Sequence, residues 1–137
     1  MSGAVMREDN EQMQSFIGAI AKALVELLDE DWEQVIFARF RVGEKLDPHH
    51  QLHVDMGDGF EDLLEKIWDD PDYDDAYFDL TDLVDAFHAY CKSCGDDWTS
   101  FCLRLENTGR FRCDYGYEPI AQVDRHFVLD WQSENLI

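Results

Sequence analysis

The sequence predicts an α+β fold in which an antiparallel sheet built from two hairpins is covered by N-terminal, central and C-terminal helices. Three observations predict this fold. Apolar residues follow helical and strand spacing in the order α-β-β-α-α-β-β-α. No strand–helix–strand crossover unit repeats along the chain, which favours an antiparallel sheet. The length of 137 residues, 45% of them hydrophobic, suits one domain over residues 1–137, with residues 1–10 flexible.

The spacing of apolar residues predicts the first helix and the first hairpin. We expect the helix from about Glu11 to Asp29, with Asn10 as its N-cap. The strand that follows covers Gln34–Val42, and a turn through residues 43–48 leads to a second strand over residues 51–56. The apolar positions that recur at helical spacing are Met13, Phe16, Ile17, Ile20, Leu24, Leu27 and Leu28.

The central segment is expected to be helical in two pieces. Gly57-Asp58-Gly59 ends the second strand, and Phe60–Trp68 has the spacing of a short helix. An acidic loop around Pro71 is expected over residues 69–75. A second helix is expected from about Thr81 to Cys94, with Gly95 at its C′ position.

The last third of the chain predicts a second hairpin and a closing helix. Alternation over residues 101–106 and 111–115 predicts two strands, and Asn107-Thr108-Gly109 predicts the turn between them. Pro119 is expected to open the last helix. Its apolar side would hold Ile120, Val123, Phe127 and Trp131.

The strongest signal in the composition is negative charge. The chain has 31 Asp and Glu against 11 Lys and Arg, a formal net charge of −20. Between Asp55 and Asp85 there are 13 acidic residues and one base, Lys66, a net of 1 − 13 = −12. Such a chain repels phosphates and anionic lipid, so we expect no direct binding of nucleic acid or membrane. It should attract basic protein surfaces.

No signal peptide, transmembrane span or lipidation motif is visible, so we expect a cytoplasmic protein with reduced cysteines. Candidate sites for metals and for catalysis are weak. Cys91 and Cys94 form a C-x-x-C at an expected helix end, where a helix raises a thiol pKa, and inert cysteines are favoured. The histidines His49, His50 and His53 are expected in a turn and on the surface, and no ligand set completes them.

An Asp-rich run at Asp70, Asp72 and Asp74 lacks the glycine and the glutamate of a calcium loop. No nucleophile–histidine spacing or phosphate-binding glycine loop is present. We therefore expect a protein that is not an enzyme, with no catalytic residue, no metal and no cofactor.

The acidic segment is instead predicted to bind a protein, although a solvated face is the simpler interpretation of most charge runs. Trp68, Tyr73, Tyr77 and Phe78 interleave with the carboxylates, and aromatic anchors beside a field of one sign are typical of a binding patch. The predicted contact set comprises the anchors Trp68, Tyr73 and Tyr77 and the acids Glu61, Glu65, Asp69, Asp70, Asp72, Asp74, Asp75, Asp79, Asp82 and Asp85.

One stretch of the second hairpin resembles a known family. Gly109–Glu118, with the sequence GRFRCDYGYE, is similar to the G-x-F-x-x-D-Y-x-Y-E strand of the YezG-like immunity proteins. Asp31-Trp32, Asp97-Trp98 and a closing helix with Arg125 and Trp131 agree in order, and the resemblance covers about Phe16 to Trp131. Tyr115, Tyr117 and Trp131 are family-like positions, but a packing role is favoured for them.

The resemblance implies a small cytosolic antitoxin without enzyme activity or cofactor. Its partner would be a cognate toxin domain, often a nuclease, of a polymorphic or contact-dependent inhibition system. This agrees with the charge, because a nuclease needs a basic surface to hold phosphates. The leading hypothesis is an immunity protein that neutralises a basic toxin by electrostatically steered occlusion of its active site. The alternative is a DNA-mimic or anti-restriction protein that binds several DNA-processing enzymes.

Overall fold

The computed structural model describes residues 11–28, 31–45, 47–68 and 70–136, and the side chains of Asp47, Lys66 and Trp68 are outside that description. The chain divides into two compact units. A helical unit takes its residues from the chain up to position 30 and from Lys66–Trp98, and a sheet unit takes Asp31–Glu65 and Thr99–Ile137. That the whole chain acts as one domain stays a prediction, as does flexibility of residues 1–10, which lie outside the described residues.

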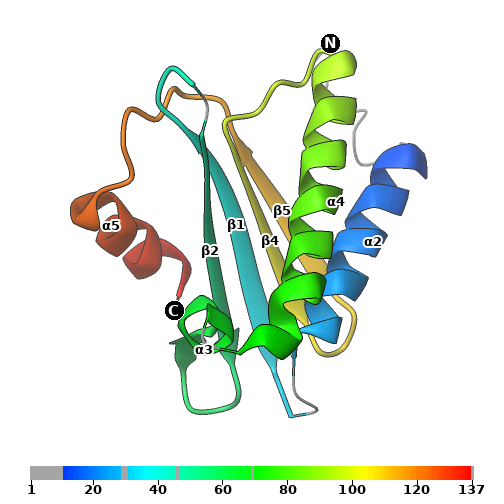
Figure 1. Ribbon diagram of the computed structural model, residues 1–137, viewed down its shortest axis with the longest axis vertical. Coiled ribbons are helices and arrows are strands. Elements are labelled where there is room, and N and C mark those ends of the chain that lie inside the picture. The colour runs from blue at the N-terminus through cyan, green and yellow to red at the C-terminus, as the bar shows by residue number, and fades with distance from the viewer. Residues whose placement is uncertain (1–10, 29–30, 46, 69, 137) are drawn as a thin grey trace. The chain divides into compact units, whose positions relative to one another are not determined.

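The helical unit is built from two long helices that lie side by side (Figure 1), α2 (Glu11–Glu26) and α4 (Asp74–Ser93), with a 3-10 turn, η1 (Pro71–Tyr73), before α4. Aromatic and sulfur contacts join the two helices. The Phe16 ring lies 5.7 Å from that of Phe87 and 5.6 Å from that of Tyr90. Cys91 Sγ lies 3.8 Å from Met13 Sδ. The helical spacing read from residues 11–28 is therefore confirmed, and its buried positions include Met13, Ile17, Ile20, Leu24 and Leu27.

The C-terminus of α4 is closed by a Schellman motif. Gly95 adopts φ +84°, a left-handed conformation that favours glycine. The amide of Asp96 donates to the Cys91 carbonyl at 2.9 Å, and that of Gly95 donates to the Lys92 carbonyl at 3.0 Å. The predicted C′ glycine is confirmed.

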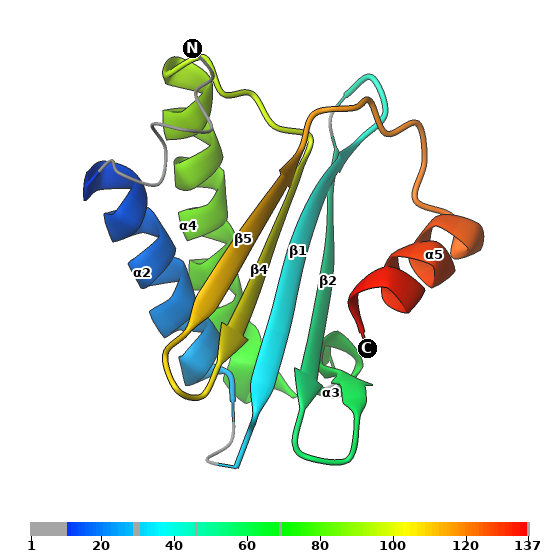
Figure 2. The same ribbon diagram turned by 180° about the vertical axis from the view of Figure 1, so that it is seen from behind.

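The sheet unit holds five antiparallel strands in the order β3-β2-β1-β4-β5 (Figure 2). Their bounds are β1 (Gln34–Val42), β2 (Asp47–Asp55), β3 (Phe60–Asp62), β4 (Ser100–Glu106) and β5 (Phe111–Gly116). The two predicted hairpins join because β1 pairs with β4, from Gln34 opposite Glu106 to Phe40 opposite Ser100. This central strand is buried throughout Val35–Phe40, and its backbone groups pair with β2 on one edge and β4 on the other.

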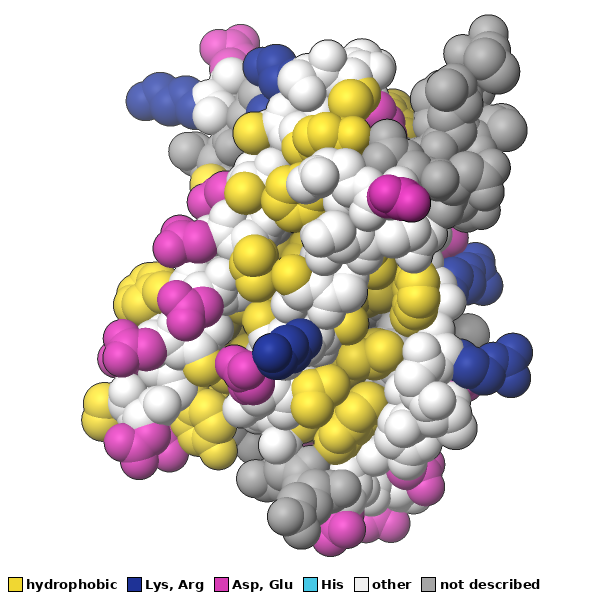
Figure 3. All heavy atoms as spheres, turned by 90° about the vertical axis from the view of Figure 1, so that its right-hand side faces the viewer, with side chains coloured by type: hydrophobic (Ala, Val, Ile, Leu, Met, Phe, Trp, Pro, Cys, Tyr) yellow, Lys and Arg dark blue, Asp and Glu magenta, His cyan; other side chains and the backbone are white. Residues whose placement is uncertain are grey.

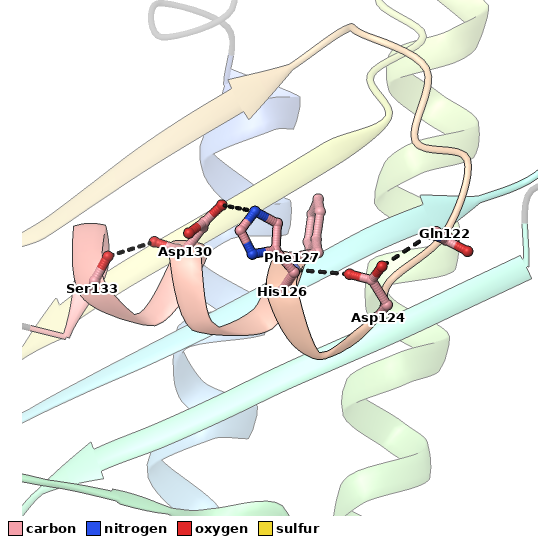
Figure 4. A network of polar contacts seen from close by, with 6 residues as sticks. All are labelled: Gln122, Asp124, His126, Phe127, Asp130 and Ser133. Carbon is pink, nitrogen blue, oxygen red and sulfur yellow. Dashed lines mark hydrogen bonds and ion pairs between the residues drawn. The ribbon is translucent and has the colours of Figure 1, made fainter.

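The last helix, α5 (Arg125–Asn135), lies against one face of this sheet. The Phe40 ring meets Phe127 edge-on at 5.1 Å and Trp131 at 6.0 Å. Asp124 caps the helix, because its Oδ1 accepts from the Phe127 amide at 2.9 Å (Figure 4). None of the α5 residues is fully buried, so the helix rests on the sheet through a few large side chains.

Four predicted boundaries were wrong. The second strand begins at Asp47, four residues before Gln51, and it contains Pro48. Residues 60–68 are not one helix but the short strand β3 followed by α3 (Leu63–Trp68). The helix predicted to start at about Thr81 begins at Asp74, so the end of the expected acidic loop, residues 74 and 75, is helical.

The fourth error concerns the chain before α5. Pro119 does not open the helix, because residues 121–124 are irregular and α5 begins at Arg125. Ile120 instead forms an isolated parallel bridge with Val42, and the Gly43 amide donates to the Ile120 carbonyl at 2.7 Å. That bridge holds the chain at the end of β1 and delays the helix.

Candidate functional site

The early start of α4 converts the acidic segment into an ordered helical surface. Leu80, Val84, Phe87 and Cys91 are buried at steps of four, three and four residues, which fixes one side of the helix inward. The opposite side is exposed and carries four carboxylates at steps of four, three and three. We call this surface the α4 acidic face, and it comprises Asp75, Asp79, Asp82 and Asp85.

The N-terminal end of this surface explains why several acids can sit there. Asp70 caps η1, since its Oδ1 accepts from the Asp72 amide at 3.1 Å, and Pro71 takes the first position of the turn. Asp74 and Asp75 occupy the first turn of α4, where the helix dipole favours negative charge. Asp79, Asp82 and Asp85 lie beyond that turn, so the dipole gives no reason for their presence.

The described members of the predicted contact set belong to both units. The members from Asp70 to Asp85 lie on η1 and α4 in the helical unit. Glu61 on β3 and Glu65 on α3 are exposed but belong to the sheet unit. Asp69 and the side chain of Trp68 lie outside the described residues. The members on η1 and α4 lie within one unit and form the part of the candidate site whose geometry is described.

The aromatic members of the segment differ in how far they are exposed. Tyr73 and Tyr77 are half-buried, whereas Phe78 is 61% exposed. The Tyr77 and Phe78 rings lie 6.2 Å apart at 54°. Phe78 was noted among the interleaved aromatics but was absent from the predicted anchors. The sequence spacing indicates that Phe78 shares the exposed side of the helix, because Phe78 lies three residues after Asp75 and four before Asp82, which puts all three on one helical face.

The histidines of β2 are not turn and surface residues, so that prediction was wrong. Gln51 links the two histidines on its face, with Nε2 lying 3.0 Å from His49 Nε2 and Oε1 lying 2.8 Å from His53 Nε2. His53 is only 3% exposed, and its ring lies 5.7 Å from that of Trp131 at an angle of 37°. Burial lowers the pKa of His49, and for His53 it outweighs the opposing effect of nearby carboxylates. Both side chains are held within β2 by their contacts to Gln51, as packing groups of the sheet unit.

The third histidine, His50, faces the other side of β2. It accepts a hydrogen bond from Arg39 Nε at 2.9 Å, and its ring stacks on Phe37 at 5.6 Å. Arg39 is 4% exposed, so this pair is an internal feature of the sheet unit. Within the described part of the chain, no group of three or more His, Cys, Asp or Glu side chains is arranged to hold a metal ion.

The four cysteines are free thiols. Cys91 is buried and Cys94 is exposed, so the two sulfurs of the C-x-x-C have different environments. Burial, followed in size by the charge of Asp114, raises the pKa of Cys102 to about 12. A thiol with that pKa stays protonated at neutral pH and is a poor nucleophile.

A polar hollow of about 420 Å³ lies in the sheet unit, at the start of β1 and beside the turn of the β4–β5 hairpin. Arg110 Nε lies 3.8 Å from Glu106 Oε2, an exposed ion pair of small energetic weight. The hollow contains no histidine or cysteine, so it offers no obvious general base or thiol. Its lining residues are Glu33, Gln34, Glu106, Asn107, Thr108 and Arg110.

Comparison with known proteins gives one assignment. The family model described as "Immunity protein YezG-like" matches residues 13–136, nearly the whole chain. No curated protein matches. Among the described residues, no helix combines the length and the apolar character needed to cross a membrane.

Proposed function

This chain belongs to the YezG-like immunity protein family, and we propose that it binds a cognate basic toxin domain, a nuclease, and occludes its active site. The observation that carries this proposal is the α4 acidic face, a preformed row of carboxylates on one side of a helix. A nuclease must present cations to the phosphates of its substrate. A carboxylate row on a rigid helix is the complementary surface.

The arrangement of the charges supports a binding function over solubility alone. Asp79 and Asp82 are three residues apart, as are Asp82 and Asp85, so neighbouring carboxylates face each other along the helix. Like charges at this spacing destabilise a helix. A cationic partner removes that repulsion, and the long-range field accelerates its arrival. Because α4 is already folded, binding does not require this segment to be ordered first.

We further propose that the protein acts in the cytoplasm, by binding and without catalysis or a cofactor, in a polymorphic or contact-dependent inhibition system. The burial of His53 and the raised pKa of the Cys102 thiol support a non-catalytic protein. Glu61, Glu65, Trp68 and Asp69 remain proposed contacts alongside those on α4.

The test is binding to a toxin nuclease domain in a catalytically inactive form, measured by biolayer interferometry. The probe variant carries Asp75→Asn, Asp79→Asn, Asp82→Asn and Asp85→Asn. A matched control removes four exposed charges from the sheet unit, with Glu44→Gln, Asp58→Asn, Glu118→Gln and Glu134→Gln. We expect the probe to lower the association rate at least about tenfold in low salt, and the control to lower it far less.

Salt separates steering from other effects. Between about 0.1 M and about 1 M salt the Debye length falls from about 10 Å to about 3 Å. The difference in association rate between the probe variant and the wild type should therefore largely disappear at the higher concentration. Equal losses in probe and control would show that net charge acts and the α4 acidic face does not. Inhibition of several unrelated DNA-binding enzymes, with no preference for the toxin, would support a DNA mimic instead.

A further inference from the structure

We propose that Phe78 is the anchor of the toxin contact and that it enters an apolar pocket of the toxin whose rim carries lysine or arginine. This inference rests on the proposed function and specifies the chemistry of the partner surface. It assigns different kinetic effects to two kinds of residue on one helix: the carboxylates bring the toxin to the site, and Phe78 holds it there.

The exposure of Phe78 is the first observation. At 61% it is the most exposed large hydrophobic side chain among the described residues, ahead of Leu129 at 50% and Phe111 at 47%. The same helix buries Phe87 completely. α4 therefore has an inner side that takes a phenyl ring, yet it presents this one to water. Binding contacts concentrate their energy in a few such aromatic side chains.

The charges around Phe78 decide what can cover it. Asp74 and Asp75 lie one turn before it on the helix, and Asp82 lies one turn after it. Carboxylates and apolar side chains lie next to one another on the surface in Figure 3. An anionic bilayer or a nucleic acid would bring further negative charge against these groups. A second copy of the same face would do so too. An apolar pocket with a cationic rim is the occupant that satisfies both the ring and its neighbours.

The helix also sets the dimensions of the partner surface. Asp75 and Asp82 are seven residues apart, which is about 10.5 Å along the helix axis, and Phe78 lies between them. The toxin should therefore carry cations on two sides of the pocket at roughly this separation. A rim cation over the face of the phenyl ring would add a cation–π contact to the burial of the ring.

The two kinds of residue should be separable in kinetics. Charges at the rim of a contact act mainly on the association rate, whereas a buried anchor acts on the dissociation rate. Removing a phenyl ring that becomes fully buried weakens binding by about tenfold to a hundredfold. We expect Phe78→Ala to raise the dissociation rate by this factor and to change the association rate by less than about twofold.

The experiment compares Phe78→Ala with Phe111→Ala, which deletes the same ring from β5 in the sheet unit, against the inactive toxin domain used above. Because Phe78 is largely exposed, its replacement should leave the melting temperature and the circular dichroism unchanged. Phe78→Tyr keeps the ring and should restore slow dissociation. The defect of Phe78→Ala should persist in about 1 M salt, where the defect of the carboxylate variant disappears.

The outcomes are distinct. Rapid dissociation in Phe78→Ala alone, at both salt concentrations, supports the anchor. If wild type binds the toxin but Phe78→Ala dissociates no faster than Phe111→Ala, the anchor is refuted and the proposed function stands. If the wild-type chain neither binds the toxin nor protects cells that express it, the proposed function fails and the anchor fails with it.

Discussion

Replacing Asp82 with asparagine should stabilise the protein while it slows association with the toxin. Asp82 lies between Asp79 and Asp85, each three residues away on the exposed side of α4. Side chains at this spacing have Cβ atoms about 5–6 Å apart. The substitution keeps the shape of the side chain and removes its repulsion from both neighbouring carboxylates at once.

The magnitude follows from this geometry. Coulomb's law for two unit charges about 6 Å apart in water gives about 0.7 kcal/mol. Salt and solvent reduce a pair on a helix surface to about 0.2–0.5 kcal/mol. Two pairs therefore give a gain of about 0.4–1 kcal/mol in the free energy of unfolding, which for a chain of this length raises the melting temperature by about 1–4 °C.

The assay is thermal unfolding followed by circular dichroism at about 0.1 M and about 1 M salt, with Glu44→Gln as the control of equal charge change in an exposed turn. Screening should abolish most of the gain at the higher concentration. A variant that is destabilised at low salt, or whose gain is the same at both concentrations, would contradict the repulsion on which the proposed function depends. The control should shift the melting temperature less than Asp82→Asn does.

Three further predictions concern stability. Burial lowers the pKa of His53, so the unfolded chain binds a proton at higher pH than the folded chain does. The free energy of unfolding should therefore fall as the pH drops below about 6.5. This group contributes at most about 1.4 kcal/mol per pH unit. In urea titrations at several pH values, His53→Phe should reduce this dependence of the free energy of unfolding on pH. An unchanged dependence would show that another group causes it. Gly95→Ala meets no atom within 4 Å of the added Cβ but must adopt φ +84°, so urea unfolding should show a loss of about 1–2 kcal/mol from backbone strain alone. Asp124→Ala removes the cap of α5 and should cost about 0.5–2 kcal/mol, seen as faster hydrogen exchange at the Val128 amide; unchanged exchange there would show that the cap is dispensable.

Much of the sheet could be predicted from local pattern. The bounds of β1 agree with the alternation over Gln34–Val42, and the turn at Asn107-Thr108-Gly109 set the second hairpin. The extension of β2 through Pro48 could not be predicted, because proline interrupts a central strand. It is tolerated here since β3 pairs with β2 only at residues 53–55, which leaves Pro48 on an edge.

The wrong start predicted for α4 has a different cause. Consecutive acids around Pro71 indicate a loop by composition, yet the burial of Leu80 and Val84 and the dipole at Asp74 favour a helix. The spacing of Asp75, Phe78 and Asp82 places Phe78 on the exposed side only if the segment is helical, and a segment interpreted as a loop offers no such distinction from Tyr77. That Glu61 and Glu65 belong to the sheet unit, and the α4 acidic face to the helical unit, could not be predicted because no local pattern encodes the division into units.

The two units alternate along the chain, since residues 1–30, 31–65, 66–98 and 99–137 belong to the helical and sheet units in turn. The helices α2 and α4 are thus made before and after the first hairpin, and the helical unit is complete only when Trp98 has been added. The 68 residues from Asp31 to Trp98 take roughly 3–14 s to translate at about 5–20 residues per second. During that interval α2 has no α4 to pack against, so only a chain whose first hairpin has already been made presents the row of carboxylates proposed to bind the toxin.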